Sequence, residues 1–242
     1  YLVMTLVKLI KNSIGGGVIL ISLATAGTAQ AVNLLQNGSF ENTAGSFVDN
    51  GLGWMSLDPG SNVIPGWKTT TAELLWGQNV NIDNITTPFG SFLLDFTGYH
   101  NSFPYGGVTQ TINTTVGQQY TLSLSLGTYQ SNPVYIGPVS VEATAGSSNQ
   151  TFTFNPSGSG SQWSSFSFDF TATSTSTPIS IVGTFSGGCC HIGLDNVSVE
   201  AKTIESVPEP DSTLGILALG VLAAGSCFNR KLSQAKESKQ DN

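Results

Sequence analysis

The sequence predicts an all-β protein built as two packed antiparallel sheets, and three observations support this fold class. Apolar and polar residues alternate with a period of two in a series of short segments, as they do in half-buried strands. Clusters of glycine, asparagine, serine and proline separate those segments, which is typical of turns. No window of residues 32–206 has the spacing of an amphipathic helix. Many short strands of this kind indicate a β-sandwich.

The clearest alternation runs through QQYTLSLSLGT at residues 118–128. Tyr120 and Leu122 are expected to face the core there, and Thr121 and Ser123 to face solvent. Further strands are predicted on the same pattern at 107–113, 138–146, 150–155, 164–173, 177–185 and 195–200. Residues 41–66 are irregular and rich in glycine, asparagine and proline, so we predict a long loop near the rim of the sandwich.

Residues 1–31 have the three parts of a secretory signal peptide. Lys8 and Lys11 are followed by an apolar stretch and by the small residues Ala29 and Ala31, after which cleavage would leave Val32 as the first residue. A membrane helix that is never cleaved is the alternative. Tyr1 is not an ordinary initiating residue, so Met4 is a candidate start.

The other end of the chain carries a short apolar run between two kinds of flank. Residues 213–228 contain no charge, and as a helix they would span about 24 Å, less than the bilayer core of about 30 Å. The flanks are the extended segment Val207, Pro208, Glu209 and Pro210 on one side, and Arg230 and Lys231 on the other. Those two cations favour a cytoplasmic end, followed by the polar tail 232–242.

This tail, residues 207–231, resembles the PEP-CTERM sorting signal of Gram-negative bacteria and cyanobacteria. The resemblance implies processing by an exosortase near Pro208–Pro210. It also implies transient anchoring in the inner membrane through residues 213–228 and release to the outer surface or the exopolysaccharide matrix. An ordinary single-span anchor is the alternative.

Charge and cysteine content restrict the class of partner. Between residues 32 and 206 only Lys68 and Lys202 are basic against eleven acidic residues, which leaves a net charge of −9. Such a surface cannot neutralise a phosphate backbone, so nucleic acid is not an expected partner. Cys189 and Cys190 are adjacent, and a strained disulfide or two buried thiols are both open.

A set of motifs occurs in a fixed order along the body of the chain. It opens with NLLQNGSFE at 33–41 and closes with GLDNVSVE at 193–200, with IPGW at 64–67 and SFLLDFTG at 91–98 between them. This series resembles domain-of-unknown-function family 642 and related carbohydrate-binding modules. The resemblance implies that residues 32–206 form a galactose-binding-like jelly roll. It also implies association with polysaccharide and does not imply an enzyme.

The same resemblance implies a structural Ca²⁺. If the first and last strands lie side by side, Glu41 comes close to Asp195, and carboxylates with carbonyl oxygens are the ligands that Ca²⁺ prefers. Glu41 and Asp195 are assigned as ligands by motif position, with Asn37 and Ser39 as candidate neighbours. In the alternative, both carboxylates only cap turns through backbone N–H groups.

A sugar-binding face needs aromatic rings for the C–H faces of the sugar and polar groups for its hydroxyls. The predicted ligand-binding residues are Trp54, Trp76, Asp95, Tyr99, His100, Asn101, Tyr105 and Tyr129. The segment TGYHNSFPYGG at 97–107 is aromatic, polar and rich in turn residues, so we expect an exposed loop. Trp67 and Trp163 are better explained as core residues.

The sequence therefore predicts an exported, non-catalytic protein that binds polysaccharide through a calcium-braced jelly roll. No metalloprotease, redox, nucleophile-elbow or phosphate-loop motif occurs in it. One alternative is a structural or adhesive matrix protein without specific sugar binding. A more distant one is a glycan hydrolase that uses Asp95 with Glu73 or Asp169.

Overall fold

The computed structural model of the 242-residue chain describes residues 32–78, 84–131, 137–187 and 191–202. Within these ranges the chain forms eleven β-strands and no helix, which confirms the all-β prediction. The strands are β1 (Trp54–Leu57), β2 (Lys68–Thr70), β3 (Leu74–Gln78), β4 (Phe92–Asp95), β5 (Gly107–Asn113), β6 (Gln119–Gln130), β7 (Val139–Ala145), β8 (Ser148–Phe154), β9 (Gly160–Thr171), β10 (Ser176–Ser186) and β11 (Gly193–Ala201).

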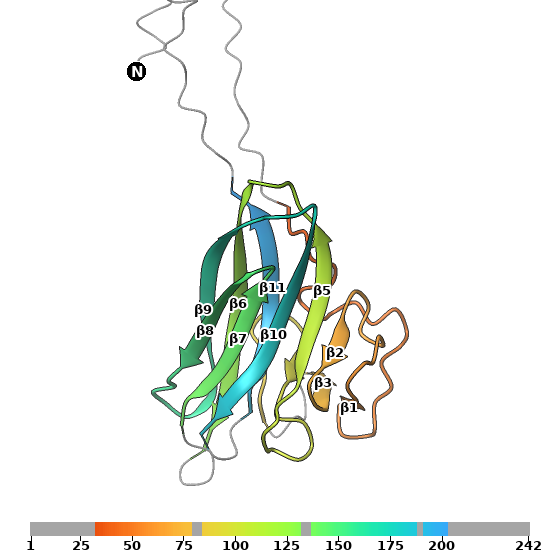
Figure 1. Cartoon of the computed structure of the whole chain (residues 1–242). Helices are drawn as coiled ribbons and strands as arrows, with labels where there is room; N and C mark the ends of the chain where they lie inside the picture. Colours follow the sequence, from red (N-terminus) through yellow and green to blue (C-terminus); the bar gives the residue numbers. More distant parts are fainter. Residues whose placement is uncertain (1–31, 79–83, 132–136, 188–190, 203–242) are drawn as a thin grey trace, which may run out of the picture. The chain divides into compact units, whose positions relative to one another are not determined.

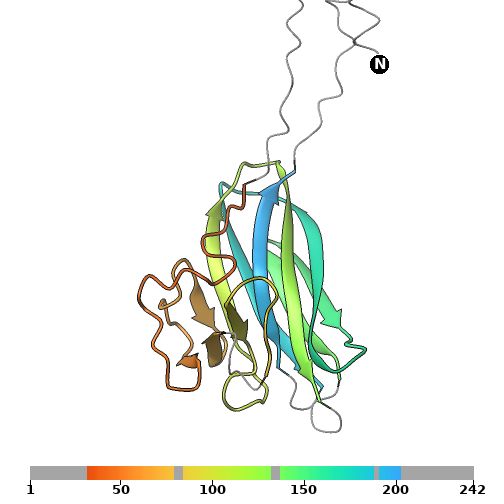
Figure 2. The same cartoon turned by 180° about the vertical axis from the view of Figure 1, so that it is seen from behind.

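The strands form two sheets whose pairings are all antiparallel. One sheet has the order β1-β3-β4-β11-β6-β9, and the other has the order β2-β5-β10-β7-β8. The two sheets lie face to face in both views of the molecule (Figures 1 and 2). This is the predicted sandwich.

The predicted alternation decides which side chains lie between the sheets. In β6, Tyr120, Leu122 and Leu124 are buried, whereas Thr121 and Ser123 are only half-buried. All seven strands predicted from alternation are present. Four strands, β1 to β4, were not predicted from alternation, and β1 lies inside the stretch 41–66 that was expected to be loop throughout.

The core between the sheets contains two of the tryptophans. Trp67 and Trp76 are buried, and their indole N–H groups donate to the backbone oxygens of Asn37 (3.0 Å) and Phe40 (3.3 Å). Trp67 is thus the core residue that was predicted. Because the buried core of the described residues extends from Leu35 to Val199, residues 32–202 contain the complete sandwich and can be studied as a folded unit.

The segment before Glu41 runs beside β11. The backbone N–H of Leu34 donates to the oxygen of Val199 (2.8 Å), and the N–H of Val197 donates to the oxygen of Gly38 (2.8 Å). A Cβ at Gly38 would lie 1.9 Å from the oxygen of Val197, so this close approach requires glycine. The beginning and the end of the domain are therefore side by side, as predicted.

The described residues include no helix long and apolar enough to cross a membrane. The predicted signal peptide 1–31, the sorting segment 207–231 and the pair Cys189 and Cys190 lie outside the described residues. They stay predictions.

Candidate functional site

A strap, residues 84–91, crosses the outer face of the six-stranded sheet. Ile85 packs there with Leu75 and Leu93 in a second apolar cluster, which Trp54, Tyr129 and Trp163 complete. Trp163 donates its indole N–H to the oxygen of Thr86 (2.6 Å). Trp163 was predicted to be a core residue. The structure corrects this, because Trp163 is a half-buried residue of the outer cluster and does not belong to the main core.

Two glycines leave room for that indole ring. A Cβ at Gly127 would lie 2.4 Å from ring atoms of Trp163, and one at Gly193 would lie 2.7 Å from Ile85.

We expect Gly127→Ala to displace Trp163 and lower the free energy of unfolding by about 1–3 kcal/mol, as overpacking does. Urea unfolding of residues 32–202 measures this. Gly158→Ala, where a new Cβ meets nothing closer than 3.5 Å, should change little, and equal effects at the two positions would contradict the packing argument.

The far end of the strap meets two carboxylates. Oε1 of Glu41 accepts the backbone N–H groups of Ser91 and Phe92, both at 2.7 Å. Asp195 is fully buried and accepts from the Thr87 hydroxyl and the Asn196 N–H, both at 2.5 Å. Burial, with a smaller contribution from the charge of Glu41, raises the pKa of Asp195 to about 7 despite these two hydrogen bonds. The two predicted ligands thus lie near enough to interact.

Glu41 and Asp195 are the two residues here that could hold a divalent cation. Among the described residues, no Lys, Arg or His forms an ion pair with either of them, so a buried Asp195 anion would lack a compensating charge. The described residues contain no group of three or more His, Cys, Asp or Glu around one point, so further ligands would be hydroxyl, carbonyl or water oxygens. The carbonyl of Asn37 already accepts from Phe40 and Trp67, and Ser39 is half-buried nearby in the sequence.

An exposed aromatic surface lies on the loop between β4 and β5. The ring of Tyr99, 66% exposed, lies 6.0 Å from the half-buried Trp54 ring, at an interplanar angle of 37°. His100 meets the edge of Tyr99 at 5.8 Å, and Phe103 is 73% exposed. We name Trp54, Tyr99 and His100 the aromatic surface. It combines two rings from separate elements that a ligand can reach from solvent.

Glu73 is the acidic residue beside the aromatic surface. Its carboxylate accepts from the Ser56 hydroxyl and from the backbone N–H of Tyr99 (3.3 Å), and it lies 3.9 Å from Nε2 of His100. A shallow pocket beside it is lined by Ala72, Glu73, Thr97, His100, Ser102 and Pro104. From the sequence, Glu73 was a candidate only as a hydrolase carboxylate. Its contact with Tyr99 joins residues 26 positions apart, so no local pattern in the sequence indicates it.

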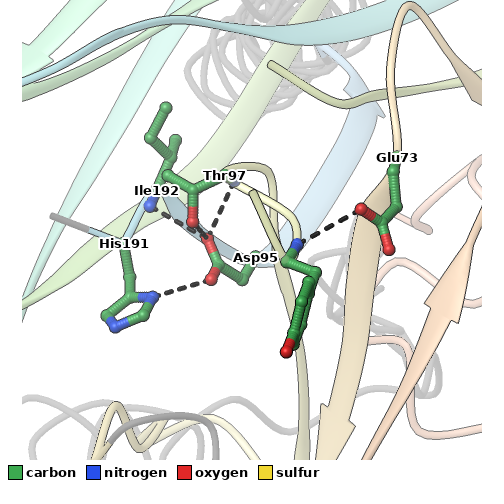
Figure 3. A network of polar contacts seen from close by, with 6 residues as sticks. Glu73, Asp95, Thr97, His191 and Ile192 are labelled. Carbon is green, nitrogen blue, oxygen red and sulfur yellow. Dashed lines mark hydrogen bonds and ion pairs between the residues drawn. The ribbon is translucent and has the colours of Figure 1, made fainter. Parts of the chain in front are cut away.

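Asp95 anchors the base of the same loop from inside the protein (Figure 3). Its Oδ2 lies 2.7 Å from Nδ1 of His191, and its Oδ1 accepts the N–H (3.0 Å) and hydroxyl (2.8 Å) of Thr97 and the N–H of Ile192 (3.2 Å). Burial alone would raise the pKa of Asp95, but the charge and hydrogen bond of His191 and the donors of Thr97 hold it below its usual value.

The structure corrects several predicted ligand-binding residues. Trp76 and Asp95 are 0% exposed, so neither offers a surface to a ligand. Tyr105 is largely buried against Phe103, and Tyr129 is half-buried in the outer cluster. Tyr99, His100 and Asn101 are exposed, as the loop prediction required. Phe103 was missed, although it stands in the same aromatic loop.

Comparison with known proteins identifies the family. A family model described as protein of unknown function, DUF642, matches residues 33–200. The chain belongs to this family. The match confirms the resemblance that the ordered motifs indicated. No curated protein matches the chain.

Solved structures similar to the DUF642 chain include three carbohydrate-binding modules. A family 4 module has 17% identity and a TM-score of 0.35, covering 69% of this chain and 99% of that one. A family 61 module in complex with β-1,4-galactotriose has 12% identity and a TM-score of 0.38, covering 71% and 99%. A family 35 module from Clostridium thermocellum has 12% identity and a TM-score of 0.35, covering 60% and 97%. The likeness is one of fold.

The opening and closing motifs of the DUF642 domain meet in space. The side chain of Asn33 accepts from the N–H of Val199 (2.9 Å) and donates to the oxygen of Val197 (3.1 Å). Glu41 ends the first of these segments and Asp195 lies near the start of the second, so the pairing helps to bring the two carboxylates together. The motifs are therefore one structural feature, which joins the ends of the domain at the strap.

Proposed function

We propose that the DUF642 domain is a non-catalytic module that binds polysaccharide at the aromatic surface. The observation that supports this most directly is the pair of rings formed by the half-buried Trp54 and the exposed Tyr99 beside the carboxylate of Glu73. Rings of this kind pack against the C–H faces of sugar rings, while the carboxylate, Asn101 and Ser102 can bond the hydroxyls. The acidic charge of the domain suits a neutral glycan better than a polyanion.

A hydrolytic role has less support. The carboxylate considered for it, Asp95, is buried, and its two oxygens contact His191, Thr97 and Ile192. A group so enclosed cannot reach a glycosidic bond without rearrangement of the loop. Its arrangement suits a role in positioning the aromatic loop.

A Ca²⁺ at Glu41 and Asp195 is part of the proposal. The ion would supply charge compensation for the buried carboxylate and would fix the strap, because Thr87 and the backbone of residues 91–92 already bond the two carboxylates. The strap packs under Trp54 through Ile85, so the ion would also stiffen the support of the aromatic surface.

Export and sorting complete the proposal. Residues 1–31 would direct secretion, and an exosortase would process the chain near Pro208–Pro210, so the domain reaches the outer surface or the matrix of a Gram-negative-type bacterium. Mass spectrometry of the protein recovered from the cell surface tests this. Peptides from beyond Asp211 in the mature protein would favour an ordinary membrane anchor instead.

Binding is tested by electrophoresis of residues 32–202, with Ca²⁺ present, through native gels that contain individual polysaccharides. We expect retardation in at least one gel. Trp54→Ala or Tyr99→Ala should each weaken binding by about 2 kcal/mol, roughly thirtyfold in affinity, because an aromatic contact at the centre of a site is lost.

The matched control is Phe185→Ala, which removes an exposed aromatic ring from β10 in the other sheet. It should leave the retardation unchanged. If folded Trp54→Ala and Tyr99→Ala proteins bind as tightly as the unaltered protein, the aromatic surface is not the binding site.

A further inference from the structure

One side of the sandwich ends in two long strands that each have a single neighbour in the described part of the chain. β9 pairs with β6, and β8 pairs with β7; both lie at the left in Figure 1. The opposite edges are short, since β1 has four residues and β2 three. The N–H of Gly60 donates to the oxygen of Thr69, and the N–H of Thr69 donates to the oxygen of Ser61, so this segment also covers β2. The two sides of the sandwich thus differ in how their edges are protected.

β9 lacks the features that keep edge strands from pairing. It is twelve residues long and stays in one uninterrupted register with β6. It contains no proline and no lysine, and residues 143–168 carry no charged side chain at all. Edge strands of natural sheets are normally protected from pairing with another chain by lysine, proline, bulges or short length. An edge without them is a template for another strand.

Aromatic side chains lie along the same side. Phe154, Phe166 and Phe168 are half-buried and pack against the core from β8 and β9. The rings of Phe166 and Phe168 lie 5.2 and 6.2 Å from that of the buried Phe152. A partner at this edge would therefore cover apolar area as well as backbone groups.

We propose that β9 pairs with β9 of a second copy, antiparallel and about a two-fold axis near Ser165, to form one continuous sheet through both molecules. A copy of the same chain fits this edge because the strand is self-complementary. With that axis, its one charge, Asp169, faces Ser161 of the second copy instead of another carboxylate. The phenylalanines of both copies then continue one apolar layer.

Charge favours the same pairing. The whole chain has a net charge of −7, so two copies repel each other over most of their surfaces. The repulsion is weakest at β8 and β9, because Asp169 is the one charged side chain of these two strands. This self-association goes beyond glycan binding, and it would give a surface or matrix protein a way to crosslink the polymer that it binds.

Sedimentation velocity of residues 32–202 over a concentration series tests the proposal. The unaltered protein should show a monomer–dimer equilibrium, and Ser165→Lys with Ser167→Lys should be monomeric at every concentration. The control, Thr173→Lys with Thr175→Lys, adds the same charge at exposed turn residues and should dimerise normally. A monomeric unaltered protein, or an edge variant that dimerises like the control, overturns the proposal.

Two further measurements separate related explanations. Thr151→Lys with Thr153→Lys alters the β8 edge, and loss of the dimer in this variant alone would place the contact on the other sheet and contradict pairing through β9. Hydrogen exchange of the unaltered protein needs no substitution: amides of residues 160–171 should gain protection as concentration rises. Trp54→Ala should still dimerise, so failure of glycan binding and failure of self-association are distinguishable.

Discussion

Replacing Asp95 with alanine is expected to lower the free energy of unfolding of the DUF642 domain by about 3–5 kcal/mol, because it breaks the buried contact between this carboxylate and the ring of His191. Asp95 and His191 are both buried, with 2.7 Å between Oδ2 and Nδ1. Three further donors, from Thr97 and Ile192, would lose their acceptor as well (Figure 3). Urea unfolding of residues 32–202 measures the loss.

Two comparisons separate the buried network from a general effect of charge. Asp169→Ala removes an exposed carboxylate that pairs with Lys202 at 2.6 Å, and solvent screens that pair, so stability should hardly change. Asp95→Asn retains one acceptor oxygen, so its free energy of unfolding should lie between those of Asp95→Ala and Asp169→Ala. If Asp95→Ala unfolds at the same urea concentration as the unaltered domain, the network does not stabilise the loop.

The fold could be predicted because most strands have one polar face. The sequence of β6 alternates from Gln119 to Leu126, and that of β9 alternates from Ser165 to Thr171. This period distinguishes strand from helix without any knowledge of the partner strand. β3 and β4 escaped prediction for a physical reason. The strap covers their outer face, so both faces are buried and the sequences LLWG and FLLD show no alternation.

The site could be predicted only where composition decides exposure. The loop with Tyr99 and His100 is rich in polar and turn residues, and these two side chains are exposed. The prediction that Trp76 and Asp95 bind ligand was wrong, because nothing local in the sequence shows which face of a strand a distant segment covers. The proximity of Glu41 and Asp195 followed from the pairing of the first and last segments, which is a property of the topology rather than of either residue.

In the absence of Ca²⁺, the DUF642 domain should become less stable as pH rises from about 5 to 8. The folded-state pKa of Asp195 is raised to about 7, above the value of the unfolded chain, so folding favours the protonated carboxyl. Its contribution is fully present below the unfolded-state pKa and is lost as pH rises through about 7. The full shift corresponds to about 4 kcal/mol, of which about 3 kcal/mol is lost between pH 5 and pH 8.

Ca²⁺ should remove this pH dependence, because the ion takes the place of the proton beside Glu41 and Asp195. Thermal unfolding of residues 32–202 with chelator or with Ca²⁺ should therefore differ strongly at pH 8 and little at pH 5, where protons compete with the ion. Asp195→Asn should show neither the pH dependence nor the response to Ca²⁺, and Asp169→Asn should retain both. Equal melting temperatures of the chelated domain at pH 5 and 8, with no shift on adding Ca²⁺, would mean that the buried carboxylate is satisfied by its hydrogen bonds to Thr87 and Asn196 alone.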